Sequence, residues 1–123
     1  MGTDASLFWL FFGFKGRISR MAFLLGGLAM LVVTMFILYR VSLAQEMENG
    51  SDFWVTALSV VAFVSLWCQT ALAAKRLHDL GQPGFWSVTM FIPFMNIVAF
   101  VVLSFLPGNP GPNRFGPDTN LPG

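Results

Sequence analysis

Four ionisable side chains stand together in the middle of the chain, in the stretch AAKRLHDLGQPGFW at residues 73–86. They are Lys75, Arg76, His78 and Asp79, and a long apolar run lies on each side of them. A histidine beside a carboxylate can act as an acid and base pair in catalysis. Adjacent residues on a helix point about 100° apart, however, so His78 and Asp79 do not form an obvious dyad. No nucleophilic serine or cysteine stands next to them, and catalysis is therefore not the favoured interpretation.

A metal or cofactor site is not indicated either. His78 is the one histidine of the chain, and neither an HxxxH nor a CxxC pattern accompanies it. The single cysteine, Cys68, lies inside an apolar run, cannot form an intramolecular disulfide, and is interpreted as a small apolar filler. We expect no cofactor and no bound metal.

The composition predicts a membrane protein. The chain has 123 residues, of which 55% are hydrophobic and 11% charged, whereas soluble domains carry about 25% charged residues. Three segments, 21–40, 53–75 and 85–106, are apolar apart from a basic residue at the end of the first two. About 20 apolar residues cross a bilayer, and none of the three segments shows the polar face of a soluble helix. The sequence predicts an all-α, polytopic membrane protein with three apolar helical segments in one domain.

The third apolar segment contains Pro93, which removes one helical hydrogen bond and clashes with the preceding turn. A kinked span is the expected outcome, because neighbouring helices can satisfy the freed carbonyl. A re-entrant hairpin that returns the tail to the side it came from is the alternative, and no glycine stands at the turn to favour it.

The two ends of the chain are expected to lie at the membrane surface. Residues 1–20 combine an aromatic cluster with basic residues, which is typical of an interfacial segment. Residues 107–123 form an extended tail that is rich in proline and glycine, where Arg114 and Phe115 resemble an interfacial anchor.

The distribution of basic residues predicts the orientation. Lys15, Arg17 and Arg20 precede the first span and Lys75 and Arg76 end the second, whereas the intervening loop QEMENGSD is acidic. The positive-inside rule places the N-terminus and the loop after residue 75 in the cytoplasm, and the acidic loop outside. If the third segment crosses completely, the tail also lies outside.

The central cluster has an explanation that requires no catalysis. Gly81 follows the second helix where a left-handed C-terminal cap is expected. Lys75, Arg76 and His78 then fall in the last turn, where the helix dipole and lipid phosphate both favour cations. Asp79 is an acid among bases, and we expect it to pair with Arg17, Arg20 or Arg76.

The polar residues inside the spans are interpreted as packing groups. Gln69, Thr70 and Asn96 are carboxamides or hydroxyls, which usually hydrogen-bond between helices for about 0.6 kcal/mol each. A channel or carrier more often shows a charged group in the membrane. Ala22 and Gly26 give one small-xxx-small spacing, a weak sign of close helix approach.

Three pieces of the chain, FKGRISRMAF, AAKRLHDLGQPGFW and LPGNPGPNRFGPD, resemble in order and spacing the signature of the DUF805 family of small bacterial inner-membrane proteins. Phe85 and Lys75 are mild departures, standing where tryptophan and arginine are common. The resemblance implies a location and an architecture, and the family name supplies no activity.

The leading hypothesis is a non-enzymatic accessory or structural protein of the bacterial cytoplasmic membrane that packs against lipid or a larger membrane complex. An oligomeric transporter or channel, with Asn96 and Pro93 along its path, is the alternative, and an enzyme acting on lipid is third. Anionic phospholipids, a larger complex or a second copy are the expected partners, and nucleic acid is not. The residues expected to bind lipid or a partner are Lys15, Arg17, Arg20, Lys75, Arg76, His78, Asp79, Trp86 and Arg114.

Overall fold

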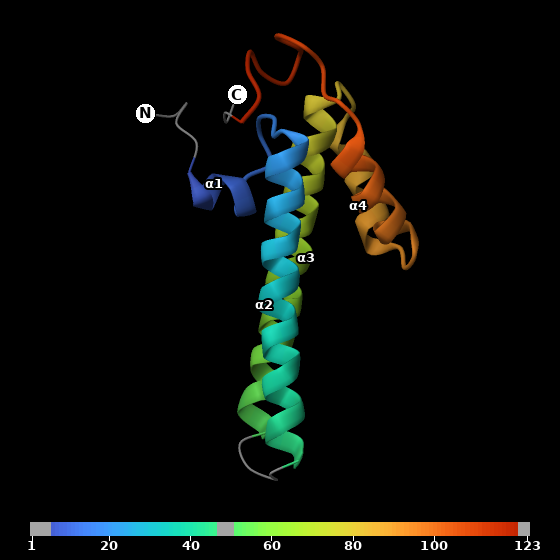
Figure 1. The fold of residues 1–123 in the computed structure, drawn as a ribbon. Helices are drawn as coiled ribbons and strands as arrows, with labels where there is room; N and C mark the ends of the chain where they lie inside the picture. The colour runs from blue at the N-terminus through green and yellow to red at the C-terminus, as the bar shows by residue number, and fades with distance from the viewer. Residues whose placement is uncertain (1–5, 47–50, 121–123) are drawn as a thin grey trace.

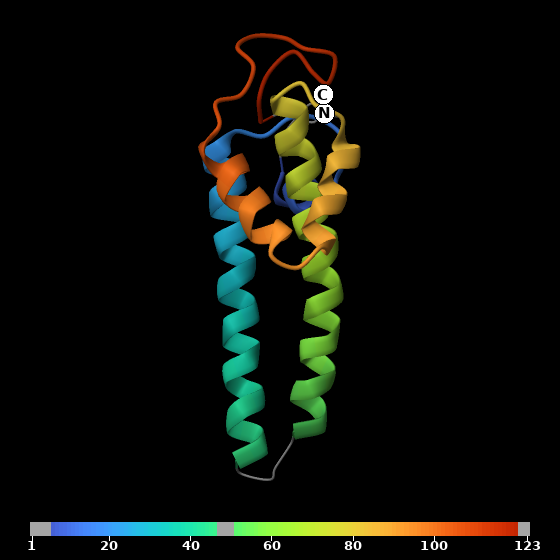
Figure 2. The same ribbon diagram turned by 90° about the vertical axis from the view of Figure 1, so that its right-hand side faces the viewer.

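Two long antiparallel helices form the body of the molecule. The computed structural model describes residues 6–46 and 51–120. Helix α2 (Arg20–Glu46) and helix α3 (Ser51–Asp79) lie side by side along most of their length (Figures 1 and 2). They contain the expected first and second segments. Residues 47–50 of the acidic loop that was expected to face outward lie outside the described residues.

The ends of the long helices have recognisable caps. The hydroxyl of Ser19 accepts a hydrogen bond from the amide of Ala22 at 3.1 Å, which satisfies one free donor at the start of α2. At the end of α3, Gly81 adopts φ 78°, and the amide of Gln82 donates to the carbonyl of Leu77 at 2.9 Å. This is the left-handed glycine cap that the sequence predicted.

The two long helices are suited to lipid. Each is longer than a ~30 Å hydrocarbon core requires at ~1.5 Å per residue. In their most apolar stretches only 17% and 28% of the residues are buried. The outward side chains are therefore apolar, the reverse of what water favours around a soluble bundle.

The third apolar segment is a hairpin of two short helices. A 3-10 helix η1 (Gly84–Phe91) leads to α4 (Met95–Phe105) after a reversal at residues 92–94. The hairpin runs down beside α3 and returns beside α2 (Figure 2). With 8 and 11 residues, neither helix is long enough to cross a bilayer. The structure thus shows a hairpin, the shape of the re-entrant alternative, where a kinked span of 85–106 was expected.

Pro93 explains the reversal. The residue before a proline is driven to extended backbone, and Ile92 has φ −99° and ψ 121°. Phe94 then adopts φ 68°, a left-handed conformation that is uncommon for a residue other than glycine. The turn forms without the glycine whose absence had favoured a continuous span.

The remaining segments gather at one end of the long helices, which we call the cap. It comprises α1 (Leu7–Phe12), residues 13–19, the last turn of α3 and the tail from 107 to 120. Helix α1 and the tail up to residue 120 lie at this same end (Figure 1), so the tail returns to the side of α1 instead of the opposite side. The main apolar core lies where these segments and the hairpin meet α3, and its buried members are Ile18, Phe23, Leu72, Ala73, Leu77, Met90 and Leu103.

Candidate functional site

Four charged side chains are buried in the cap. Arg17 is 1% exposed, Lys75 and Arg76 are 0% exposed, and Asp79 is 3% exposed. Burying a charge is costly unless it is paired and hydrogen-bonded. Three cations and one anion give the cluster an excess of positive charge, so most of the compensation has to come from neutral acceptors.

Asp79 is the centre of the cluster. Its Oδ1 accepts from Nε of Arg17 at 3.0 Å, and its Oδ2 accepts from Nη1 of Arg76 at 2.7 Å. The hydroxyl of Thr119 also donates to Oδ1. A Cβ atom on Gly108 would overlap Oδ2, so the tail can pass the carboxylate only with a glycine there. The expected pairing of Asp79 with Arg17 and Arg76 is confirmed.

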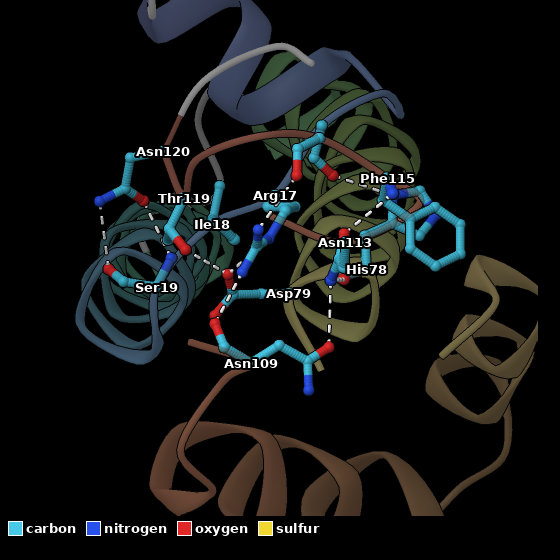
Figure 3. Close-up of polar contacts among 12 residues, drawn as sticks. Arg17, Ile18, Ser19, His78, Asp79, Asn109, Asn113, Phe115, Thr119 and Asn120 are labelled. Atoms are coloured by element: carbon cyan, nitrogen blue, oxygen red, sulfur yellow. Dashed lines mark hydrogen bonds and ion pairs between the residues drawn. The ribbon is translucent and has the colours of Figure 1, made fainter. Parts of the chain in front are cut away.

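Arg17 fixes the tail (Figure 3). Its Nη1 donates to the carbonyls of Gly111 and Gly116 at 2.7 and 3.1 Å, and its Nη2 donates to that of Asn109 at 2.8 Å. The amide of Asn109 donates in turn to the carbonyl of Asp79 at 2.7 Å. A guanidinium group has five donors in a rigid plane, and here that plane positions three points of a segment without regular structure.

Arg76 fixes the returning arm of the hairpin. Its Nε donates to the carbonyl of Leu103 at 2.8 Å, and its Nη2 donates to the carbonyl of Leu106. These carbonyls belong to the end of α4, where the free acceptors of a helix need partners and a positive charge is favourable. A weaker bond of 3.3 Å joins Nη1 to the carbonyl of Ile18.

Lys75 fixes α1 in the same way. Its Nζ donates to the carbonyls of Trp9, Leu10 and Gly13 at 2.6, 2.5 and 2.7 Å. These carbonyls lie at the end of α1, where that of Trp9 also accepts from the amide of Gly13 at 2.9 Å, and the ammonium group lies 4.8 Å from the centre of the Trp9 ring. Each of the three buried cations therefore donates to three backbone carbonyls and fixes a different segment.

His78 lies at the edge of the cluster and is half-buried. Its Nδ1 lies 2.9 Å from the carbonyl of Gly16, which can only accept, so Nδ1 carries the proton. Its ring stacks on Phe115 at 4.1 Å and 6°, and the side-chain amide of Asn113 donates to its backbone carbonyl at 2.8 Å. Phe115 thus packs against the protein. The guanidinium group of Arg114 lies over the Phe115 ring, 4.7 Å from the ring centre.

The remaining expected residues are exposed. Arg20 does not pair with Asp79; its Nη1 donates to the carbonyl of Phe105 at 3.1 Å. Lys15 and Arg114 lie on the surface of the cap, and Trp86 lies on the surface of η1. These four side chains can reach lipid or a partner, whereas Arg17, Lys75, Arg76 and Asp79 are engaged inside the protein.

The arrangement is a clamp and offers little for chemistry. Asp79 already accepts from two guanidinium groups and a hydroxyl, which leaves it poorly placed to take a proton from a substrate. Within 6–46 and 51–120, no three His, Cys, Asp or Glu side chains gather as metal ligands. Sequence reasoning missed Thr119 and the tail carbonyls, and the one available signal was the dense polar and glycine pattern of NRFGPDTN.

Comparisons with known proteins find inner membrane proteins among the relatives of this chain. Inner membrane protein YhaH of Escherichia coli K12 is 30% identical over 110 residues, covering 89% of this chain and 88% of the relative. The uncharacterized protein YiiR of the same organism is 30% identical over 136 residues, covering 90% and 88%. Inner membrane protein YhaI is 40% identical over 48 residues, which is 39% of this chain and 41% of that protein. No solved structure matches.

One family model matches most of the chain and not only the three signature pieces quoted above. The model described as "Protein of unknown function (DUF805)" aligns with residues 11–117, from the end of α1 to the tail over the clamp. This range includes every charged member of the buried cluster. The chain therefore belongs to the DUF805 family.

Proposed function

We propose that the chain is a non-enzymatic accessory or structural protein of the bacterial inner membrane that packs against a larger membrane protein complex. Two relatives carry the name inner membrane protein, and α2 and α3 are long and apolar enough to cross a bilayer. The hairpin then enters the hydrocarbon from the side of the cap without crossing it.

The internal use of the buried charges carries the proposal. Arg17, Lys75, Arg76 and Asp79 hold α1, the hairpin and the tail against α3, and each is almost completely enclosed. A catalytic or ion-conducting group must meet substrate or ion, whereas a structural clamp must exclude them. The charged residues of the signature therefore serve to hold the fold together, and the fold presents an apolar hairpin at its surface.

The cap is placed on the cytoplasmic side. Lys15 and Arg20 lie at the cap together with the buried cations, and Arg40 lies toward the other end of α2. The positive-inside rule orients such a protein with its basic end in the cytoplasm. Lys15 and Arg114, both exposed at the cap, are then available to acidic groups of a partner or to anionic phospholipid.

Retention in native-membrane particles tests the proposal. A tagged protein is extracted with an amphipathic polymer, and the proteins that remain bound are quantified by mass spectrometry. We expect a stoichiometric membrane complex with the wild-type chain. Replacing Lys15 and Arg114 with glutamine removes two surface charges of about 1 kcal/mol each near an anionic surface, so retention falls about tenfold or more.

The matched control is Arg40→Gln, an exposed basic residue that lies away from the cap. It leaves retention unchanged if the cap is the docking surface. Equal loss in both variants, or a wild-type chain that retains no other membrane protein at defined stoichiometry, contradicts the accessory function. A homo-oligomer that carries lipid alone favours the transport alternative.

A further inference from the structure

An open cavity of about 500 Å³ lies between the long helices and the hairpin. Its walls come from α2, α3, η1 and α4, with Leu31 and Ala62 among the apolar residues. Pockets for small molecules usually have volumes of about 300–1,000 Å³ and mostly apolar walls with a few polar groups. The ring of Phe100 packs so closely on Gly27 that a Cβ atom there would overlap it, which fixes the distance between α2 and α4.

Two carboxamides line this cavity, and one of them has an unpaired oxygen. Oε1 of Gln69 is the one buried side-chain polar atom without a hydrogen bond among the residues that the structure describes. Asn96 lines the same cavity from α4 and is half-buried. A buried polar group without a hydrogen bond is costly, and native proteins rarely leave one unexplained.

The position of the cavity along α3 makes water a poor explanation for these groups. Gln69 precedes Lys75 by six residues, which is about 9 Å along a helix. If the cap lies at the membrane surface, as proposed above, Gln69 lies inside the hydrocarbon of the same leaflet. A partner for the carboxamides at this depth has to come from the membrane itself.

We propose that the cavity binds one uncharged membrane lipid through a hydroxyl group, which can donate to the unpaired Oε1 of Gln69. No Asp, Glu, Lys, Arg or His is among the lining residues, so nothing there balances the charge of a phosphate head group. The carboxamides of Gln69 and Asn96 can each donate and accept, which matches a neutral hydroxyl-bearing head. The apolar walls contact the hydrocarbon part of the ligand.

The experiment uses two lipid probes that share this chemistry. Purified full-length protein in mild detergent is titrated with dioleoylglycerol or, under reducing conditions, with a short-chain isoprenoid quinol, and bound ligand is counted by native mass spectrometry. Two variants test the cavity. Gln69→Leu removes one carboxamide at nearly constant volume, and Ala62→Phe fills the space.

We expect one probe molecule per chain. Loss of one hydrogen bond inside a membrane protein weakens binding by about threefold or more for Gln69→Leu, and Ala62→Phe abolishes it. The control is Ala29→Phe, which adds the same ring to an exposed position of α2 outside the cavity. Circular dichroism and size-exclusion elution show whether each variant remains folded.

Each outcome decides a separate question. Saturable binding of diacylglycerol alone identifies a glycerolipid, binding of the quinol alone identifies a quinol, and binding of both supports the shared chemistry. The proposal is overturned if neither probe binds, if both variants bind like the wild type, or if a second copy of the chain fills the cavity in cross-linking. Retention of a partner complex in native particles is measured independently, so either proposal can fail alone.

Discussion

At the scale of single residues, one carboxylate balances two buried guanidinium groups. Asp79 contacts Arg17 from the N-terminal lead and Arg76 from its own helix, and both cations have almost no exposed surface. The Coulomb attraction within such a group offsets the cost of desolvation only while every member is present. The carboxylate is therefore the most sensitive charged position of the cap.

Replacing Asp79 with asparagine keeps its shape and removes its charge. Two guanidinium groups then remain buried without a counter-ion, and breaking a buried ion pair in this way typically costs about 3–5 kcal/mol. We expect the free energy of unfolding to fall by about this amount, measured by denaturant titration in mild-detergent micelles.

The matched control is Asp118→Asn, an exposed aspartate of the tail, for which a change within about 0.5 kcal/mol is expected. A double-mutant cycle adds a stricter condition. On an Arg17→Met background, Asp79→Asn leaves one unpaired cation instead of two, so its cost must be smaller than in the wild type. Equal costs in the two backgrounds contradict the ion-pair account.

At the scale of elements, hydrogen bonds from the buried cations hold short segments that bury too little apolar area to be held by packing alone. Helix α1 has only 6 residues, which is too short to be stable alone in water. The Lys75 ammonium donates to the carbonyls of Trp9 and Leu10 in α1 and to that of Gly13 just after it. The indole of Trp67 adds one bond to the carbonyl of Phe12 at 3.0 Å.

Lys75→Met tests this attachment because methionine has a similar length and cannot donate. The carbonyls of Leu10 and Gly13 lose this donor, whereas that of Trp9 keeps the amide of Gly13, and an unsatisfied buried acceptor costs about 1–3 kcal/mol. We expect faster amide hydrogen exchange over residues 7–14, while the bond from Trp67 keeps α1 from leaving completely. Lys15→Met, on the exposed surface of the same segment, serves as the control. Unchanged exchange in the Lys75 variant contradicts the role given to this side chain.

Local chemistry in the sequence predicted part of this architecture. The left-handed cap at Gly81 follows from a glycine at a helix end, and the pairing of Asp79 follows from one acid among several bases. The reversal at Phe94 could not be predicted in the same way, because its positive φ depends on the packing of the hairpin and not on its residue type. The acceptors of Arg17 were equally hidden, since every residue of the tail carries the same backbone carbonyl.

At the scale of the whole molecule, the hairpin decides the side of the tail. Helices α2 and α3 run out and back, and the hairpin turns back beside them, so α1 and the tail up to residue 120 both lie at the cap (Figure 1). Whether the third segment is a span or a hairpin therefore decides the side on which the tail lies, and it does not affect the two long helices. It also explains how Arg17 and Thr119, which are far apart in the sequence, meet the same carboxylate.

Cysteine accessibility distinguishes the two topologies. In a Cys68→Ala background, single cysteines are placed at the exposed positions Lys15, Gln45 and Asp118 and treated with a membrane-impermeant maleimide on intact spheroplasts. With the cap in the cytoplasm, Gln45→Cys reacts at once, and Lys15→Cys and Asp118→Cys react only after lysis. A complete third span would expose Asp118→Cys together with Gln45→Cys. A reversed pattern, in which Lys15→Cys and Asp118→Cys react and Gln45→Cys does not, would refute the cytoplasmic cap and still support the hairpin, because the two termini would share a side.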